Sequence, residues 1–141
     1  MSQLNPDTIP RVDLDFMNED HQTAVALINK LIQLAIAEDS GKIEHSFNAL
    51  ILHHAEHFAH EEEEMVRYGF PPYDCHKGEH ERVMAEMQSE LENWKESGDS
   101  THLYNYLSNT LVSWFYNHVN TMDSVTATFV KRFQDINLKT H

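Results

Sequence analysis

The sequence predicts an all-α protein, an antiparallel up-down-up-down four-helix bundle with an irregular N-terminal arm. Apolar residues recur at spacings of three and four along four long segments, as expected for the buried face of a helix. The 141 residues include only four glycines and four prolines, and most of these lie in the arm or between the segments. None of the segments has the sustained apolar–polar alternation of a half-buried strand. We therefore expect an arm over residues 1–17 and one helical domain over residues 18–141.

The first two expected helices cover about residues 18–38 and 42–68. Asn18 or Asp20 is suited to cap the first helix, because a short polar side chain can accept a hydrogen bond from a free backbone N–H there. Gly41 follows the first helix and Gly69 follows the second, and glycine is common just past a helix end. The apolar stripes are Val25, Ile28, Ile32 and Ala35, then Phe47, Leu50, Phe58 and Met65.

The third and fourth expected helices cover about residues 74–97 and 99 or 100 to 133. Pro71 and Pro72 separate the third helix from the second, and Gly98 separates it from the fourth. At about 1.5 Å rise per residue the four helices are about 30–45 Å long, and the short loops require antiparallel neighbours. The apolar stripes are Val83, Met87, Leu91 and Trp94, then Leu107, Leu111, Phe115, Met122 and Phe129.

Charge and composition narrow the classes of function. Lys and Arg number 10 against 23 Asp and Glu, so the formal net charge is −13 with histidine neutral. We expect no binding to nucleic acid or to an anionic membrane surface, because both rely on clustered Lys and Arg. No apolar run approaches the roughly 20 residues that span a bilayer. The N-terminus has no secretory-signal pattern and Cys75 is the one cysteine, so the expected compartment is the cytoplasm.

Seven polar side chains interrupt or flank the apolar stripes, in a chain with an unusual total of eleven histidines. They are His21, His57, Glu61, His76, His80, His118 and Asp123. In an antiparallel bundle the starts of the first and third helices meet the ends of the second and fourth, so we expect all seven at one end. His118 and Asp123 differ by about 140° around an α-helix, so we expect them to flank one inward face. Buried imidazoles and carboxylates need partners, which here means a shared proton or a metal.

The composition of this set favours a pair of first-row metal ions. Five imidazoles and two carboxylates exceed the needs of one zinc ion, and the lack of thiolates argues against structural zinc or an iron–sulfur cluster. Histidine with carboxylate suits iron or manganese. If both carboxylates and a water-derived oxygen bridge two metals, three histidines complete six-coordination on one metal. Two histidines leave the other five-coordinate, and a vacant position in an apolar cavity suits a small ligand such as dioxygen.

The ordered motifs resemble those of the hemerythrin family in its single-domain bacterial form. They read D-H-Q-x6-N-K-L at 20–31, H-F-x-x-E-E-x-x-M at 57–65, H-K-x-E-H at 76–80 and W-F-x-x-H-x4-D at 114–123. Four motifs in this order are specific, whereas H-x-x-x-E alone would be weak. The resemblance covers essentially the whole chain after the arm.

This resemblance implies a non-haem di-iron site and reversible binding of dioxygen for storage, delivery or sensing, rather than an enzyme. It implies that His76, His80 and His118 bind one iron, that His21 and His57 bind the other, and that Glu61, Asp123 and an oxo or hydroxo group bridge them. Dioxygen would bind at the open position of the two-histidine iron. Two alternatives use the same site: an enzyme that reduces peroxide or nitric oxide, and a sensing module whose iron state alters binding to a separate protein partner of unknown identity.

Residues around the seven carry weaker expectations. Phe58, Phe115, Val119 and Met122 are expected to line the ligand pocket. Glu62, Glu63, Glu64 and His60 are expected at the solvated surface. His54 lies three residues before His57 near the core stripe, and it is either a core residue or a hydrogen-bond partner of a metal-binding side chain.

Overall fold

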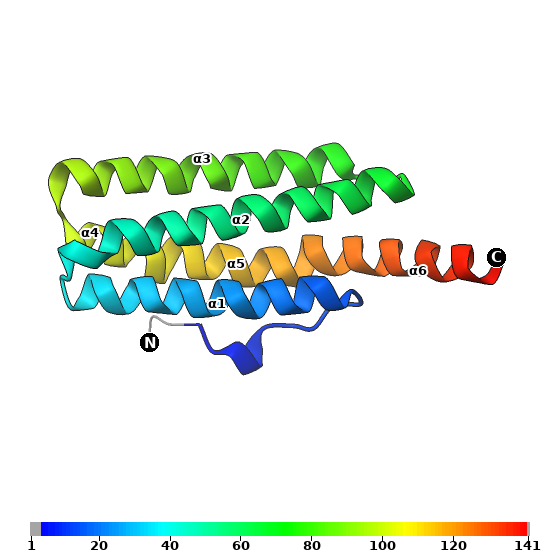
Figure 1. Cartoon of the computed structure of the whole chain (residues 1–141), viewed down its shortest axis with the longest axis horizontal. Helices are drawn as coiled ribbons and strands as arrows, with labels where there is room; N and C mark the ends of the chain where they lie inside the picture. The colour runs from blue at the N-terminus through cyan, green and yellow to red at the C-terminus, as the bar shows by residue number, and fades with distance from the viewer. Residues whose placement is uncertain (1–3, 141) are drawn as a thin grey trace.

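The chain forms four antiparallel helical rods, which Figure 1 shows for the computed structural model. The structure describes residues 4–140, so residues 1–3 of the expected arm and residue 141 lie outside the described part. The rods are α1 (Asp15–Ile36), α2 (Ser40–Tyr68), α3 (Tyr73–Ser97) and a fourth made of α4 (Ser100–Asn105), η2 (Tyr106–Leu111), α5 (Val112–His118), η3 (Val119–Asp123) and α6 (Ser124–Thr140). Residues 4–140 contain no strand, and the predicted all-α up-down-up-down bundle is confirmed. None of the described helices is both long and apolar enough to cross a membrane.

The N-terminal arm, which contains the short 3-10 helix η1 (Pro6–Thr8), lies along α1 (Figure 1). Two asparagine side chains of α1 fasten it. Asn29 binds both backbone groups of Leu4 at 2.8 Å, and Asn18 binds the N–H and C=O of Val12 at 2.9 and 2.8 Å. The helix begins at Asp15, earlier than expected, and its N-cap residue makes no side-chain cap bond. The expectation that Asn18 caps α1 is therefore wrong, because its amide holds the arm instead.

Two of the three predicted glycine stops are confirmed. Gly69 ends α2 with φ of 68° and Gly98 ends α3 with φ of 64°, a left-handed conformation that glycine adopts without strain. The first stop is wrong, because Gly41 lies inside α2. The left-handed residue after α1 is Glu38, with φ of 52°, and the next residue bonds back to the end of α1.

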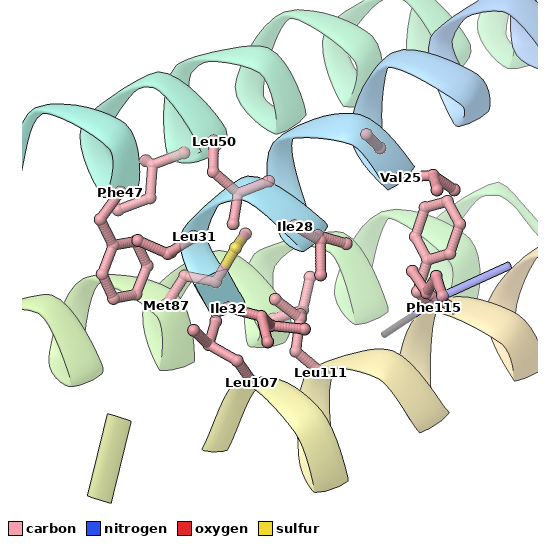
Figure 2. Close-up of a cluster of buried hydrophobic side chains, with 14 of the residues drawn as sticks. Val25, Ile28, Leu31, Ile32, Phe47, Leu50, Met87, Leu107, Leu111 and Phe115 are labelled. Carbon is pink, nitrogen blue, oxygen red and sulfur yellow. The ribbon is translucent and has the colours of Figure 1, made fainter. Parts of the chain in front are cut away.

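The apolar core fills the part of the bundle where α1 ends and α4 begins. Figure 2 shows side chains from all four rods meeting there, with Ile32 of α1, Phe47 of α2 and Met87 of α3 among them. The fully buried side chains in this cluster include Ile28, Leu31, Ile32, Phe47, Leu50, Met87, Leu107 and Leu111. All of these except Leu31 belong to the stripes read from the sequence, so the four inward faces are correctly predicted in this half.

Two π-helical segments, η2 and η3, interrupt the fourth rod. A π turn bonds residues five apart and so shifts the helical register relative to an α turn. From η3 onward the predicted stripe is wrong: Met122 within η3 and Phe129 after it are only half-buried, whereas Ala127 and Val130 are fully buried. The end near residue 133 is also wrong, because α6 continues to Thr140 and extends past α2 and α3 (Figure 1).

We predict that Asn18→Ala lowers the free energy of unfolding by about 1–3 kcal/mol, because it leaves the buried N–H and C=O of Val12 without their partner. Urea unfolding measures the loss, and hydrogen exchange at the Val12 amide reports release of the arm. Asn48→Ala, at an exposed position of α2, is the control. Equal stability of the two variants, with Val12 still protected, would contradict this account of the arm.

Candidate metal centre

The seven polar side chains singled out in the sequence lie together at one end of the bundle. Each is at most 6% exposed. Their candidate ligand atoms form two groups, within each of which all atoms lie within 4.8 Å of one another. One group holds Glu61, His76, His80, His118 and Asp123, and the other holds His21, His57, Glu61 and Asp123. The two groups therefore share both carboxylates and divide the five imidazoles three to two.

Around Glu61, three imidazoles point their Nε2 atoms at the carboxylate. The Nε2 of His57 lies 2.7 Å from Oε2, while those of His80 and His76 lie 3.1 and 3.5 Å from Oε1. Despite these distances, both Glu61 oxygens and the Nε2 atoms of His57 and His80 lack a well-oriented hydrogen bond within the described residues. They are buried atoms that approach one point without bonding to one another.

Around Asp123 the arrangement is similar. The Nε2 of His21 lies 2.9 Å from Oδ2, and those of His76 and His118 each lie 3.1 Å from Oδ1. The Nε2 atoms of His76 and His118 are only 3.2 Å apart. Two imidazole nitrogens at this distance need either a proton between them or a shared cation.

The π turn η3 determines how Asp123 meets His118. On a continuous α-helix these residues would point about 140° apart, which was the sequence-based expectation. Instead, the Ser124 N–H bonds to the carbonyl of Val119, five residues back, and the wider turn brings Asp123 onto the same side as His118. The two side chains are in direct contact rather than on opposite flanks of the site.

Three of the five imidazoles use Nδ1 to bind a neighbouring side chain away from the cluster. The pairs are His57 with Asp20 at 2.7 Å, His80 with Glu62 at 2.9 Å and His76 with Thr126 at 2.8 Å. An acceptor at Nδ1 holds the hydrogen on that nitrogen and leaves the Nε2 lone pair free to bind a metal, which is the usual support for a metal-binding histidine.

These supporting residues were missed or misjudged in the sequence. Asp20 is not a helix cap, and Glu62 is half-buried rather than part of the solvated surface. Glu64 is also half-buried, whereas Glu63 and His60 are exposed as expected. Asp20 and Glu62 each adjoin a candidate ligand in the sequence, and that adjacency was the available signal.

The electrostatics favour ionised carboxylates. Burial and the neighbouring Asp123 tend to raise the pKa of Glu61, but the charge and contact of His57 and the contact of His80 outweigh them and lower it to about 2. Burial likewise opposes ionisation of Asp123, but His118, His21 and His76 lower its pKa well below the ordinary value. Burial disfavours protonated His57, but Glu61 and Asp20 raise its pKa to about 10. In the metal-free protein His57 therefore holds a proton that a metal would displace.

A small cavity with a volume of about 10 Å³ adjoins the cluster. Its lining consists of His21, Ala24, His53, His54, His57, Phe58, Trp114, Phe115, His118 and Asp123. Phe58 and Phe115 line it as expected, whereas Val119 and Met122 do not. Because of the register shift at η3, Met122 lines a separate hollow together with Phe70 and Thr126.

The number, type and arrangement of these side chains fit a pair of metal ions. The buried oxygens of Glu61 and the Nε2 atoms of His57 and His80 converge without a well-oriented hydrogen bond among the described residues, so a cation would satisfy them. Nitrogen and oxygen donors without a thiolate suit first-row metals such as iron. The shared carboxylates allow two ions to lie side by side.

The fold and the site together define a helical-bundle protein with a buried cation-binding centre. The family model described as the hemerythrin HHE cation binding domain matches residues 12–130. The chain therefore belongs to the hemerythrin family, which confirms the resemblance inferred from the four motifs. This membership implies binding of non-haem iron, and the cluster of His, Glu and Asp fits a di-iron oxygen-binding protein.

Three curated relatives are named bacteriohemerythrin. The protein from Aquifex aeolicus (strain VF5) is 27% identical over 124 residues, which is 88% of this chain and 95% of the relative. The protein from Methylococcus capsulatus (strain ATCC 33009 / NCIMB 11132 / Bath) is 25% identical over 113 residues, 80% of this chain and 85% of the relative. The protein from Ralstonia nicotianae (strain ATCC BAA-1114 / GMI1000) is 35% identical over 85 residues, 60% of this chain and 61% of the relative.

We predict that Glu62→Ala weakens metal binding by about 10- to 100-fold, because His80 loses the acceptor that orients its ring. Titration against a competing chelator measures the affinity. Glu63→Ala is the matched control, since Glu63 is the next residue and is exposed. An unchanged affinity in Glu62→Ala, with the fold intact, would show that the Glu62 contact does not support the site.

We also predict that the metal-free protein loses part of its stability as the pH falls from about 4.5 to about 2. The pKa of Glu61 is about 2 in the folded protein against an ordinary value of 4.5, so its contribution is present above pH 4.5 and disappears as pH falls through the folded pKa. Urea unfolding across this range measures the slope. Glu61→Gln cannot titrate and should show a shallower slope, and identical slopes would contradict the assignment.

Proposed function

We propose that this protein binds dioxygen reversibly at a non-haem di-iron centre. In this proposal His76, His80 and His118 bind one iron and His21 and His57 bind the other. Glu61 and Asp123, together with an oxo or hydroxo group, would bridge the two ions. The role would be storage, delivery or sensing of oxygen.

The observation that carries this proposal is the division of donors between the two groups. One group offers three imidazoles and two carboxylates, while the other offers two imidazoles and the same two carboxylates. The second metal position thus has one protein ligand fewer than the first. Both imidazoles of that poorer group, His21 and His57, line the small cavity, whereas of the three imidazoles in the richer group only His118 does. This supports an open ligand position on the His21–His57 side.

The surrounding residues restrict what reaches the site. Phe58 stacks on His80 with ring centroids 3.8 Å apart, and Trp114 stacks on His118 at 4.6 Å. These aromatic walls leave little room for water and limit proton access. When bound, an iron pair supplies the electrons that reversible oxygen binding requires, and the protein supplies the dry, shaped pocket.

An enzyme that reduces peroxide or nitric oxide and an iron-dependent sensing module would both use the same centre. Among the described cavity residues, the one carboxylate is Asp123, which the proposal already uses as a bridge. No separate feature of the described chain favours either alternative. Turnover with a reductant would identify the enzyme, and iron-dependent capture of a partner chain would identify the sensor.

The test begins with metal analysis of freshly purified protein, for which we expect two irons per chain. The reduced protein is then exposed to air, and we expect a charge-transfer absorption band that disappears when oxygen is removed. Glu61→Ala removes one proposed bridge and should empty at least one metal position. A single zinc ion, or rapid irreversible oxidation without an oxygenated spectrum, would contradict the proposal.

A further inference from the structure

His54 is a buried imidazole that the proposed metal centre leaves unused. It lies on α2 about one turn before His57 and is 2% exposed. Its ring nitrogens belong to neither group of converging donors. Even so, it lines the cavity beside His21 and His57. His54 is therefore a buried polar side chain of the cavity lining to which the proposed metal centre gives no role.

The hydrogen-bond partner of His54 fixes its tautomer. Its Nδ1 lies 3.0 Å from the backbone carbonyl of Leu50, and a carbonyl oxygen can only accept, so Nδ1 carries the hydrogen. A neutral imidazole has one N–H, so Nε2 is left with a lone pair. Burial, aided by the neighbouring histidines, outweighs the Leu50 hydrogen bond and lowers the pKa of His54 to about 3, so the ring stays neutral near pH 7.

The Nε2 of His54 is buried and has no hydrogen-bond partner among the described residues. Other cavity imidazoles differ from it. The Nε2 of His53 is 3.0 Å from the carbonyl oxygen of Asp20 and so is occupied. His21 and His118 leave Nδ1 unpartnered, but once Nε2 binds a metal that Nδ1 carries a hydrogen and can only donate. His54 therefore brings to the cavity a free acceptor in place of a free donor.

The size of the cavity limits what this acceptor can meet. Its volume of about 10 Å³ is close to the least that holds one water molecule. Phe58 packs edge-on against His54 with ring centroids 5.4 Å apart, and its ring offers the lone pair no N–H or O–H donor. Only a very small ligand fits, and one that carries a hydrogen can satisfy the lone pair.

We propose that Nε2 of His54 accepts a hydrogen bond from a small hydrogen-carrying ligand bound in the cavity beside the His21–His57 metal position. The ligand class comprises hydroxide, water and hydrogen peroxide. An aprotic ligand of the same size has no hydrogen to donate to the Nε2 lone pair, so His54 does not stabilise its binding. The inference rests on the proposed function for the metal, and it adds a residue that discriminates between ligands by their hydrogen.

The tautomer is tested first, without any metal. Nitrogen-15 NMR of the metal-free protein, with long-range correlations from ring hydrogens, reports which nitrogen of each imidazole is protonated. We expect His54 to carry its hydrogen on Nδ1 and to keep Nε2 unprotonated between pH 6 and 8. A hydrogen on Nε2 would overturn the inference while leaving the proposed function untouched.

Ligand discrimination is tested with hydroxide and fluoride, which are isoelectronic anions of similar size, of which only hydroxide carries a hydrogen. Each is titrated into the oxidised, iron-loaded protein and followed by absorption. We expect His54→Phe to weaken hydroxide binding by about two- to tenfold, the worth of one hydrogen bond, and to leave fluoride binding unchanged. His54→Gln retains an acceptor oxygen and should recover much of the hydroxide affinity. His45→Phe, at an exposed position of α2, is the control.

The outcomes separate the two claims. If His54→Phe weakened the binding of hydroxide and fluoride equally, His54 would only fill space, and the inference would be wrong. Unchanged hydroxide binding in His54→Phe would also overturn the inference. Thermal unfolding of the variants distinguishes a misfolded His54→Phe protein from a specific loss, and His54→Gln then provides the comparison. A wild-type protein that takes up no iron would overturn the proposed function, and with it the ligand, whatever the tautomer of His54.

Discussion

The structure depends on the burial of two carboxylates in one layer of a helical bundle. Glu61 and Asp123 are 1% and 2% exposed, and charges so deeply buried must be neutralised where they lie. Five imidazoles from all four rods surround them, so each rod has to place its histidine at the same depth. The apolar side chains in the other half of the bundle pack the four rods against one another (Figure 2). This packing fixes how far each antiparallel rod lies along its neighbours, and so the depth of each histidine. The core therefore fixes the relative positions of the rods, and these positions bring the seven side chains of the site together.

Much of this could be predicted from the sequence because it follows α-helical periodicity. His57 and Glu61 are four apart, as are His76 and His80, so ordinary helix geometry puts each pair on one face. Gly69 and Gly98 marked real helix ends, since glycine readily adopts the left-handed conformation found at both positions. Periodicity also placed the core correctly as far as Phe115 and failed only from η3 onward.

Other features could not be predicted, for identifiable physical reasons. The roles of Asp20 and Glu62 depend on which neighbouring rod each side chain faces, and a single helix does not specify its neighbours. His54 looked ambiguous because its function depends on a hydrogen-bond partner one turn back and on the cavity in front of it. The π turn was hidden as well, since nothing in the apolar pattern before Val119 announces a change of register.

The π turn η3 also affects how similar metal-binding pairs can be recognised in other sequences. Partners that touch along an α-helix are three or four residues apart, whereas the π geometry of η3 lets His118 and Asp123 touch at a separation of five. A homologue lacking one residue here could form the same contact with a regular helix. A search for such pairs should therefore allow H-x3-D as well as H-x4-D at this position.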